Sequence, residues 1–491
     1  MKKLFILILF CSPSLFAQGL AYGTYFGGSQ PDVAHGIVLG SFNSMFIAGQ
    51  TASPDFPVLR AYQPTLAGEV NAFAAKFDTN GKLLWSTFLG GSGQDRAAAV
   101  ASYRGRYFYV TGTTNSTDFP VTDGVVQPVL NGPGSNAFVA KFNNFGELIW
   151  STYLGESGSQ GNAIALDAKG NIFIAGSTGA GVDLDGFVTE LNPAGTAILF
   201  NTTIGGSGTD SIQSIALLGD EVYATGYTNS TDFPVTSGAA ERNCGPACAD
   251  YYTGFVAKLG GSGVSYATYL GGTETTVANT TFNTGIGIAV DSVGNAYITG
   301  TTNTIDFPVT SKAFQTTYGG TTDLPNGVAG CIDFLNGQFP CGDAYVVKLN
   351  PTGSAITWAT YLGGSTADIG YSIKLDTKGN VWVGGYTQSY ACSVCDPVHT
   401  PFPTSADAYQ SVKGGGLDSF LSEISPDGST LIYSTYYGGS NDEIAFGLAV
   451  DAQGSGYLAG RTISIDTPVS SNAYQKNLVG IIDAFIAKIV P

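Results

Sequence analysis

The sequence predicts an all-β fold, a seven-bladed β-propeller whose four-stranded antiparallel blades close into a ring. Three observations lead to this prediction. One set of three phrases recurs seven times in a fixed order. Each phrase alternates apolar and polar residues and is rich in β-branched and aromatic types, as strands are. The first strand after the leader has the pattern of the one strand that the last repeat lacks.

The first repeated phrase has the form aromatic-x-Thr-aromatic-Leu-Gly-Gly-Ser. Its seven copies begin at Tyr22, Trp85, Trp150, Phe200, Tyr266, Trp358 and Tyr433. Their first glycines are Gly27, Gly90, Gly155, Gly205, Gly271, Gly363 and Gly438. Because these aromatic residues hold equivalent positions, we expect them to pack between blades rather than to form a platform for sugars.

The other two phrases predict the remaining strands of each unit. The second reads VDSVGNAYITGTT from Val290, and the third reads DAYVVKL from Asp343. Asp-x-x-Gly-Asn and Asn-Pro-x-Gly have the chemistry of tight turns between strands. For the fifth unit, the expected strands A to D are Ile288 to Asp291, Asn295 to Thr302, Asp343 to Leu349 and Trp358 to Leu362.

The ends of the chain predict how the ring closes. The last unit stops after its strand C, and residues 20–26 form a strand D with no unit before them. Pairing the two would complete the seventh blade and remove an open sheet edge. The propeller then spans residues 18–491, with blades at about 27–89, 90–154, 155–204, 205–270, 271–362, 363–437, and 438–491 plus 20–26.

A position in strand A supports a ring over an open solenoid. Strand A should run nearest the axis, where seven backbones crowd together. The residue that opens its core is small in all seven units. These residues are Gly36, Ala99, Ala163, Ser214, Gly287, Ser372 and Gly447.

The phrases GGSxxD, DxxGNxYxxGxT, SxDFPVT and DAFVAKL resemble the bacterial SBBP repeat, a family named for a seven-bladed β-propeller. The resemblance covers nearly all of the chain after the leader, and several phrases recur together in register. It implies the propeller fold and an exported bacterial origin. It implies no general chemistry that could be assigned to residues of this chain.

The amino terminus and the charge indicate a secreted protein, extracellular or periplasmic. Residues 1–17 have the pattern of a signal peptide, with Lys2 and Lys3 before an apolar run from Leu4 to Phe10. No other stretch is long and apolar enough to span a bilayer. The net charge of −17 disfavours nucleic-acid partners, because phosphates would be repelled.

Six cysteines follow the leader in three close pairs. In an oxidising compartment, an even number of cysteines favours local disulfides. We expect the pairs Cys244–Cys248, Cys331–Cys341 and Cys392–Cys395. The alternative is a metal site at Cys392 and Cys395, which form a CxxC without a second CxxC nearby.

One rim of the ring is the expected binding face. The segments between strands B and C are long and variable, contain all three cysteine pairs, and share this face with the links from strand D to the next strand A. Several links carry an Asp after Gly-Gly-Ser, at Asp32, Asp95, Asp210, Asp368 and Asp442. These carboxylates could surround a channel mouth and hold Ca²⁺, which takes roughly six to eight oxygens. Alternatively, each Asp accepts N–H bonds of its own turn, and repetition in blade after blade favours this role.

The sequence favours binding over catalysis, and no organic cofactor is expected. There are two histidines, His35 and His399, and no HExxH, Gly-x-Ser-x-Gly or P-loop motif. The first hypothesis is a noncatalytic binding or scaffolding module that recognises a glycan, peptide or protein on the rim. The second is a polysaccharide-acting enzyme, a glycoside hydrolase or lyase, with carboxylates at the channel mouth. The third is a structural protein of the cell envelope.

Overall fold

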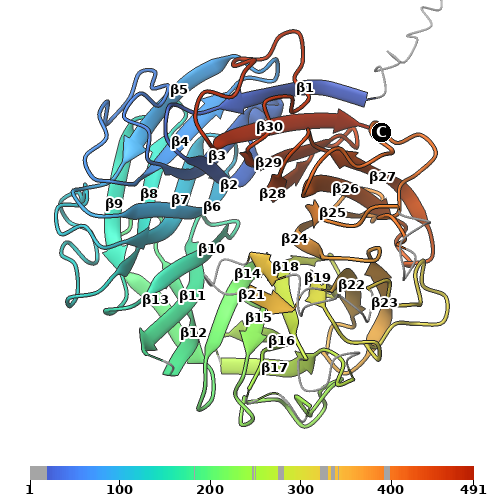
Figure 1. Cartoon of the computed structure of the whole chain (residues 1–491). Coiled ribbons are helices and arrows are strands. Elements are labelled where there is room, and N and C mark those ends of the chain that lie inside the picture. Colours follow the sequence, from blue (N-terminus) through green and yellow to red (C-terminus); the bar gives the residue numbers. More distant parts are fainter. Residues whose placement is uncertain are drawn as a thin grey trace, which may run out of the picture.

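The computed structural model shows seven four-stranded antiparallel sheets arranged in a ring around one axis (Figure 1). The all-β fold with seven blades is therefore confirmed. The structure describes residues 19–181, 183–245, 248, 250–261, 263–274, 281–320, 330–332, 338–340, 342–391 and 399–491. The predicted signal peptide, Cys341, and the pair Cys392 and Cys395 lie outside these residues.

Blades 1 to 3 follow one another along the chain, each with its strands in sequence order. Blade 1 consists of β2 (Asp32–Leu39), β3 (Met45–Thr51), β4 (Asn71–Phe77) and β5 (Leu83–Leu89), with the short 3-10 helix η1 (Ser41–Asn43) after β2. Blade 2 consists of β6 (Asp95–Tyr103), β7 (Tyr107–Thr114), β8 (Asn136–Asn143) and β9 (Leu148–Leu154). Blade 3 consists of β10 (Gln160–Leu166), β11 (Ile172–Ala180), β12 (Asp183–Leu191) and β13 (Ile198–Ile204).

Blades 4 to 6 repeat this order. Blade 4 consists of β14 (Asp210–Leu218), β15 (Glu221–Thr228), β16 (Thr253–Gly260) and β17 (Gly263–Leu270). Blade 5 consists of β18 (Asn283–Val290), β19 (Ala296–Thr302), β22 (Asp343–Leu349) and β23 (Ile356–Leu362), with the hairpin β20 (Gly330–Ile332) and β21 (Gln338–Pro340) between β19 and β22. Blade 6 consists of β24 (Asp368–Leu375), β25 (Val381–Thr387), β26 (Asp418–Ile424) and β27 (Leu431–Tyr437).

Blade 7 joins the two ends of the chain. It consists of β28 (Glu443–Val450), β29 (Gly456–Thr462) and β30 (Asp483–Val490), with β1 (Gly19–Phe26) as its outer strand. β1 pairs antiparallel with β30, from Gly19 opposite Val490 to Phe26 opposite Ala484. The two strands lie side by side at the top of Figure 1. This is the pairing that the sequence predicts.

Every strand A carries a β-bulge at one position, just before the small residue noted in the sequence. In β2, the register with β3 shifts between Ala34 and Gly36, and the same shift recurs in β6, β10, β14, β18, β24 and β28. A Cβ built on Gly36 would lie 3.2 Å from the backbone nitrogen of Val100 in the next blade. The strands of neighbouring blades therefore approach closely here, which explains the small residues.

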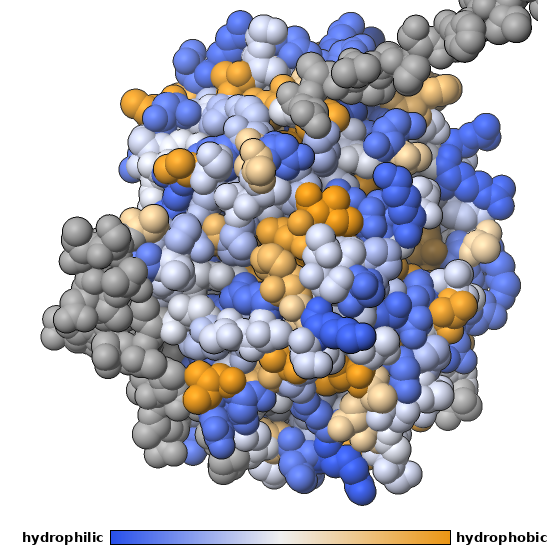
Figure 2. All heavy atoms as spheres, turned by 90° about the vertical axis from the view of Figure 1, so that its right-hand side faces the viewer, coloured by the Kyte–Doolittle hydropathy of each residue, from blue (hydrophilic) through white to orange (hydrophobic). Residues whose placement is uncertain are grey.

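The hydrophobic core lies between adjacent blades rather than in one central cluster. The strand D aromatics contribute to it as predicted, and six of the seven are buried. Phe200 of blade 3 is the exception and is only half-buried. The side of the ring formed by blades 5 and 6 shows its apolar side chains in separate clusters among hydrophilic ones (Figure 2).

The segments between strands B and C do not stay on one rim, as the sequence suggested, but run along the outer edges of the blades. In blade 1, the backbone of Leu59 exchanges hydrogen bonds of 3.1 and 2.9 Å with Ser86 of the outer strand β5. In blade 2, Val126 reaches the C–D turn of blade 3, where its N–H donates to Gly195 O at 2.9 Å. The physical reason is that an outer strand has unpaired backbone groups, which these segments satisfy.

No helix among the described residues has the length and apolar character needed to cross a membrane.

Candidate functional site

Four of the predicted metal-binding residues hold the turns that precede strand A. Asp32, Asp95, Asp210 and Asp368 are fully buried. In each link, the second glycine of Gly-Gly donates its N–H to the Asp four residues later, at 2.6 to 2.9 Å. A Ser hydroxyl also donates to each carboxylate. These contacts correspond to the turn role rather than to an open ring of ligands.

Asp442 is not the equivalent residue in blade 7. The strand register pairs Glu443, not Asp442, with Thr462, and Glu443 accepts the Gly439 N–H at 2.6 Å. Asp442 instead accepts the N–H of Leu417 at 3.0 Å. Glu443 follows the second glycine by four residues, as Asp32 does, so Asp442 stands one residue before the equivalent position. The expectation for Asp442 is therefore corrected.

The buried acids meet a second polar position at each boundary between blades. The residue that opens strand C of one blade lies beside the residue that opens strand A of the next. A Cβ built on Gly363 would lie 2.7 Å from Asp343 Cγ and 2.7 Å from Asp368 Oδ2, so only glycine fits between them. We call these couples junction pairs. Six glycines have both members of such a couple beside them: Asp483 with Asp32, Asn71 with Asp95, Asp185 with Asp210, Thr253 with Asn283, Asp343 with Asp368, and Asp418 with Glu443. The equivalent positions between blades 2 and 3 hold Asn136 and Ser159.

The two-carboxylate junctions have raised pKa values. Burial, which is partly offset by hydrogen bonds, raises the pKa of Asp32 from 3.8 to about 7, and the charge of Asp483 adds to the rise. Burial and then the charge of Asp368 raise the pKa of Asp343 well above its usual range. Burial of this kind favours the protonated acid. Since these carboxyl groups are enclosed, a polysaccharide cannot reach them, which argues against their use as a catalytic pair.

The Asp residues of the DFP phrase also accept bonds from neighbouring turns. Asp55 accepts the N–H of Ser29 at 2.8 Å, and these bonds hold the pKa of Asp55 below its usual value. Asp118, Asp232, Asp306 and Asp466 accept the corresponding N–H. Within the part of the chain that the structure describes, no three His, Cys, Asp or Glu side chains converge as a metal site.

One cysteine pair lies within the described residues. Cys244 and Cys248 form a disulfide in the B–C segment of blade 4, with Cα atoms 5.5 Å apart. The pairs Cys331–Cys341 and Cys392–Cys395 stay predictions, because at least one member of each lies outside the described residues.

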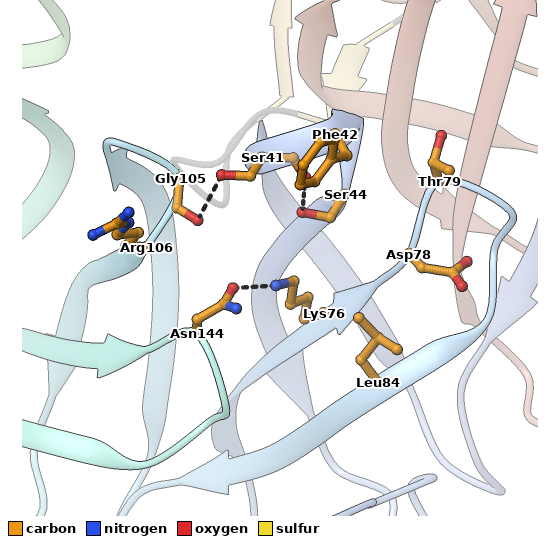
Figure 3. Close-up of a pocket in the computed structure, with 10 residues that line it drawn as sticks. All are labelled: Ser41, Phe42, Ser44, Lys76, Asp78, Thr79, Leu84, Gly105, Arg106 and Asn144. Atoms are coloured by element: carbon orange, nitrogen blue, oxygen red, sulfur yellow. Dashed lines mark hydrogen bonds between the residues drawn. The ribbon is translucent and has the colours of Figure 1, made fainter.

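The turn face of the ring holds a cavity of about 430 Å³ between blades 1 and 2 (Figure 3). Lys76 lines it and donates to Asn144 Oδ1, while the Asp78 carboxylate points away toward its own turn. The equivalent lysines of blades 5 and 7, Lys348 and Lys488, pair with an Asp of the A–B turn. In blade 1 this turn has no acid. Lys76 retains the ring contact that the other two lysines also make, with its ammonium 4.8 Å from the centre of the Phe46 ring.

The residue displaced by each strand A bulge lies near the axis on the loop face. These residues are His35, Ala98, Asn162, Gln213, Ile286, Tyr371 and Phe446. Aromatic residues gather on one side, where Phe446 lies 5.1 Å from Tyr371 and 5.2 Å from His35 between ring centroids. The axis therefore has an aromatic side in blades 6, 7 and 1 and an amide-bearing side in blades 3 and 4.

Two arginines lie near His35 at this end of the axis. Burial is the main cause that lowers the pKa of His35 to about 4, and the charges of Arg96 and Arg461 contribute to the decrease. A hydrogen bond with Gln50 acts in the opposite direction and raises this pKa. Arg96 is exposed and donates to Gln94 Oε1 at 3.1 Å, and Arg461 is half-buried. Neither arginine forms an ion pair with a described residue. We call His35, Gln50, Arg96 and Arg461 the axial cluster.

The axial cluster could not be found from the repeats. No other blade carries an arginine at either position. The other blades have Val, Gln, Ser, Thr or Ile in place of Arg96, and Gln, Thr, Ser or Tyr in place of Arg461. The sequence offered one indication: basic residues are few, 20 in a chain of net charge −17, so an arginine at a position that is not basic in the other repeats stands out.

The comparisons with known proteins agree with this architecture. The family model for the SBBP β-propeller repeat matches residues 149–181, 266–308 and 357–390. The chain carries matches to the SBBP repeat within a seven-bladed β-propeller. Each matched stretch runs from a strand D into strands A and B of the next blade.

A curated relative of this chain is distant. The regulatory protein FlaEY of Caulobacter vibrioides is 23% identical over 383 residues, which make up 72% of this chain and 35% of that protein. The chain thus spans about a third of the length of this curated relative.

Three solved structures resemble the chain over almost its whole length. A protein of unknown function from Dyadobacter fermentans is 10% identical and covers 96% of this chain and 99% of its own, with a TM-score of 0.40. Chaetomium thermophilum Sqt1, bound to the N-terminus of ribosomal protein L10, is 10% identical over 96% and 100%, with a TM-score of 0.42. Polysaccharide lyase Uly1 is 7% identical over 98% and 94%, with a TM-score of 0.43.

Proposed function

We propose that this protein is a noncatalytic binding or scaffolding module that recognises an acidic ligand at the axial cluster on its loop face. The observation that carries the proposal is that Arg96 and Arg461 face the same end of the axis and have no acidic partner among the described residues. In a chain of net charge −17, two unneutralised guanidinium groups form a local site for an anion.

The neighbours of the arginines fit an acidic sugar or an acidic peptide side chain. A guanidinium group binds a carboxylate through two parallel hydrogen bonds. Since the pKa of His35 is about 4, its imidazole is neutral at pH 7 and can exchange hydrogen bonds without adding charge. Phe446, against His35, supplies an apolar ring face of the kind on which sugar rings stack.

Titration calorimetry with a galacturonic acid oligomer and the matching neutral galactose oligomer tests the proposal. We expect the acidic oligomer to bind and the neutral one not to bind. The double variant R96A/R461A should weaken binding by about tenfold or more, because the charged hydrogen bonds are lost. The control R104A/R106A removes the same charge from the A–B turn of blade 2, on the opposite face, and should leave binding unchanged.

Two results would contradict this function. Equal affinity for both oligomers, or full binding by R96A/R461A, would exclude the axial cluster as the site. Shortening of the oligomer during the titration, followed by chromatography, would instead support a polysaccharide-acting enzyme.

A further inference from the structure

Blade 3 differs from the other six blades in its outer edge. The chain passes from β11 to β12 through a tight hairpin, so blade 3 has no long B–C segment. Asn201 and Thr203 of its outer strand β13 are exposed, whereas the equivalent Ser86 and Phe88 of blade 1 are fully buried. The sequence of β13, ILFNTTI, contains neither proline nor charge, the residues that usually protect an edge strand.

The other blades show what normally covers this edge. In each of them, a residue of the B–C segment donates its N–H to a strand D carbonyl, and a Gln or Glu four or five residues later accepts an N–H two positions along strand D. In blade 6, the Ser405 N–H donates to Ser434 O at 3.0 Å, and the Tyr436 N–H donates to Gln410 O at 3.0 Å. The six segments contact strand D through Leu59 and Gln63, Thr122 and Gln127, Thr236 and Glu241, Thr310 and Gln315, Ser405 and Gln410, and Ser470 and Gln475.

A threonine of strand D completes this contact in all six blades. Its hydroxyl accepts the N–H of the Gln or Glu at 2.8 to 3.1 Å. Blade 3 retains this residue as Thr202, although no described segment donates to it. The residues on either side of Thr202 differ from those of blade 1. Asn201 replaces Ser86, and Thr203 replaces the buried Phe88.

We propose that the outer edge of β13 binds an extended segment of a partner polypeptide with a Ser or Thr followed five residues later by Gln or Glu. The bound segment would run along β13 as the B–C segments run along the other outer strands. Its backbone would exchange hydrogen bonds with Asn201 and Thr203, and the N–H of its Gln or Glu would donate to Thr202. This is strand addition to an exposed sheet edge, with backbone bonds giving affinity and one hydroxyl giving register.

The chain itself supplies the probe. A fluorescently labelled peptide of residues 403–412, PTSADAYQSV, contains the blade 6 segment from Ser405 to Gln410. We expect its anisotropy to rise and saturate when the full chain is added. N-methylation of the peptide at Gln410 removes the N–H that the threonine accepts and should weaken binding by about tenfold.

Two variants of the full chain locate the binding. T203P removes the outward N–H of β13, and an edge strand tolerates proline at such a position. T202V keeps the shape of the side chain and removes its acceptor, which tests the same edge without changing the backbone. Each should weaken peptide binding by about tenfold. T79V, at an exposed turn of blade 1 on the turn face, should bind like the natural chain.

Unchanged binding by both T203P and T202V, or the absence of saturable binding by the natural chain, would overturn the proposal. So would concentration-dependent dimerisation in sedimentation that T203P abolishes, because a second copy of the chain would then occupy the edge. Since the axial cluster lies near the axis and β13 at the circumference, R96A/R461A should bind the peptide normally. The two proposals can therefore fail separately.

Discussion

The junction between blades 1 and 2 and the junction between blades 5 and 6 have the same backbone and different chemistry. In the first, Asn71 Nδ2 donates to Asp95 Oδ2 at 3.1 Å, so one buried carboxylate faces an amide. In the second, Asp343 faces Asp368, and burial raises the pKa of both. Asn71 Oδ1 and Asp343 Oδ2 accept the same kind of backbone N–H, from Ala67 and Gly319, both at 2.8 Å.

This comparison shows that the fold requires an acceptor at the start of strand C but not a charge. The backbone N–H groups before strand C bind an amide oxygen as well as a carboxylate oxygen. The stability of the junction depends on what else the side chain presents to the neighbouring acid. An amide nitrogen donates a hydrogen bond to that acid, whereas a second carboxylate repels it. The repeats therefore contain both kinds of junction, one with an amide and one with a second carboxylate. Substitutions that convert one kind into the other should transfer its stability and pH dependence.

The largest expected effect is a loss of stability with rising pH. The pKa of Asp32 is about 7 in the fold and near 3.8 when unfolded, so between these values the folded chain keeps a proton that the unfolded chain has released. Stability therefore falls as the pH rises from about 4 to about 7, by on the order of 4 kcal/mol for this group. Urea midpoints between pH 5 and pH 8 measure it. D32N should flatten the slope, and an unchanged slope would contradict the assignment.

Removing the amide at the first junction should cost the next largest amount. N71A leaves the N–H of Ala67 without its acceptor and removes one of the donors to the buried carboxylate of Asp95, so we expect a loss of about 3 kcal/mol. Urea unfolding at pH 7 checks this value. The matched control N131A removes an exposed amide side chain and should change the free energy of unfolding by less than about 0.5 kcal/mol.

Converting the first junction into the second should make it pH-dependent. N71D places two carboxyl groups side by side and should raise the pKa of Asp95. We expect a loss of about 2 kcal/mol at pH 8 that shrinks toward zero at pH 5, where one of the two acids keeps its proton. A loss of the same size at both pH values would show that the donor, not the charge, matters.

The reverse conversion should have the smallest effect. D343N gives the junction of blades 5 and 6 the amide of blade 1, and we expect a gain of about 1 kcal/mol at pH 8. The gain should vanish at pH 5, where Asp343 is already protonated. Destabilisation at pH 8 would mean that the fold requires Asp343 as an anion. That result would favour a cation bound at this junction.

Most of the fold could be predicted from the sequence because it repeats. The small residues from Gly36 to Gly447, the strand D aromatics and the strand missing from the last repeat each recur or close a pattern. The Gln or Glu by which each B–C segment contacts strand D, such as Gln63, was missed. The B–C segments differ in length, so these residues do not align when the repeats are compared. The junction pairs were missed because they join residues of different blades, with Asp32 and Asp483 at opposite ends of the chain.

The candidate site could be predicted only in part. Repetition indicated that the Asp residues after Gly-Gly-Ser hold their turns. Asp442 was chosen wrongly, although Glu443 keeps the four-residue spacing from the second glycine and Asp442 does not. Arg96 and Arg461 belong to different blades and to different strands, A and B. Comparing the repeats with one another cannot predict that these two arginines lie near the same histidine, because only the closed ring brings their blades together.

The pairing of β1 with β30 sets the order of events when the chain is made. Gly19 leaves the ribosome 471 residues before its partner Val490, the difference between the two residue numbers. Until β30 has been made, β1 is an apolar ribbon without a sheet partner. A nascent chain of this protein therefore has to be shielded, or to fold its other blades first, until a single late event completes the circle.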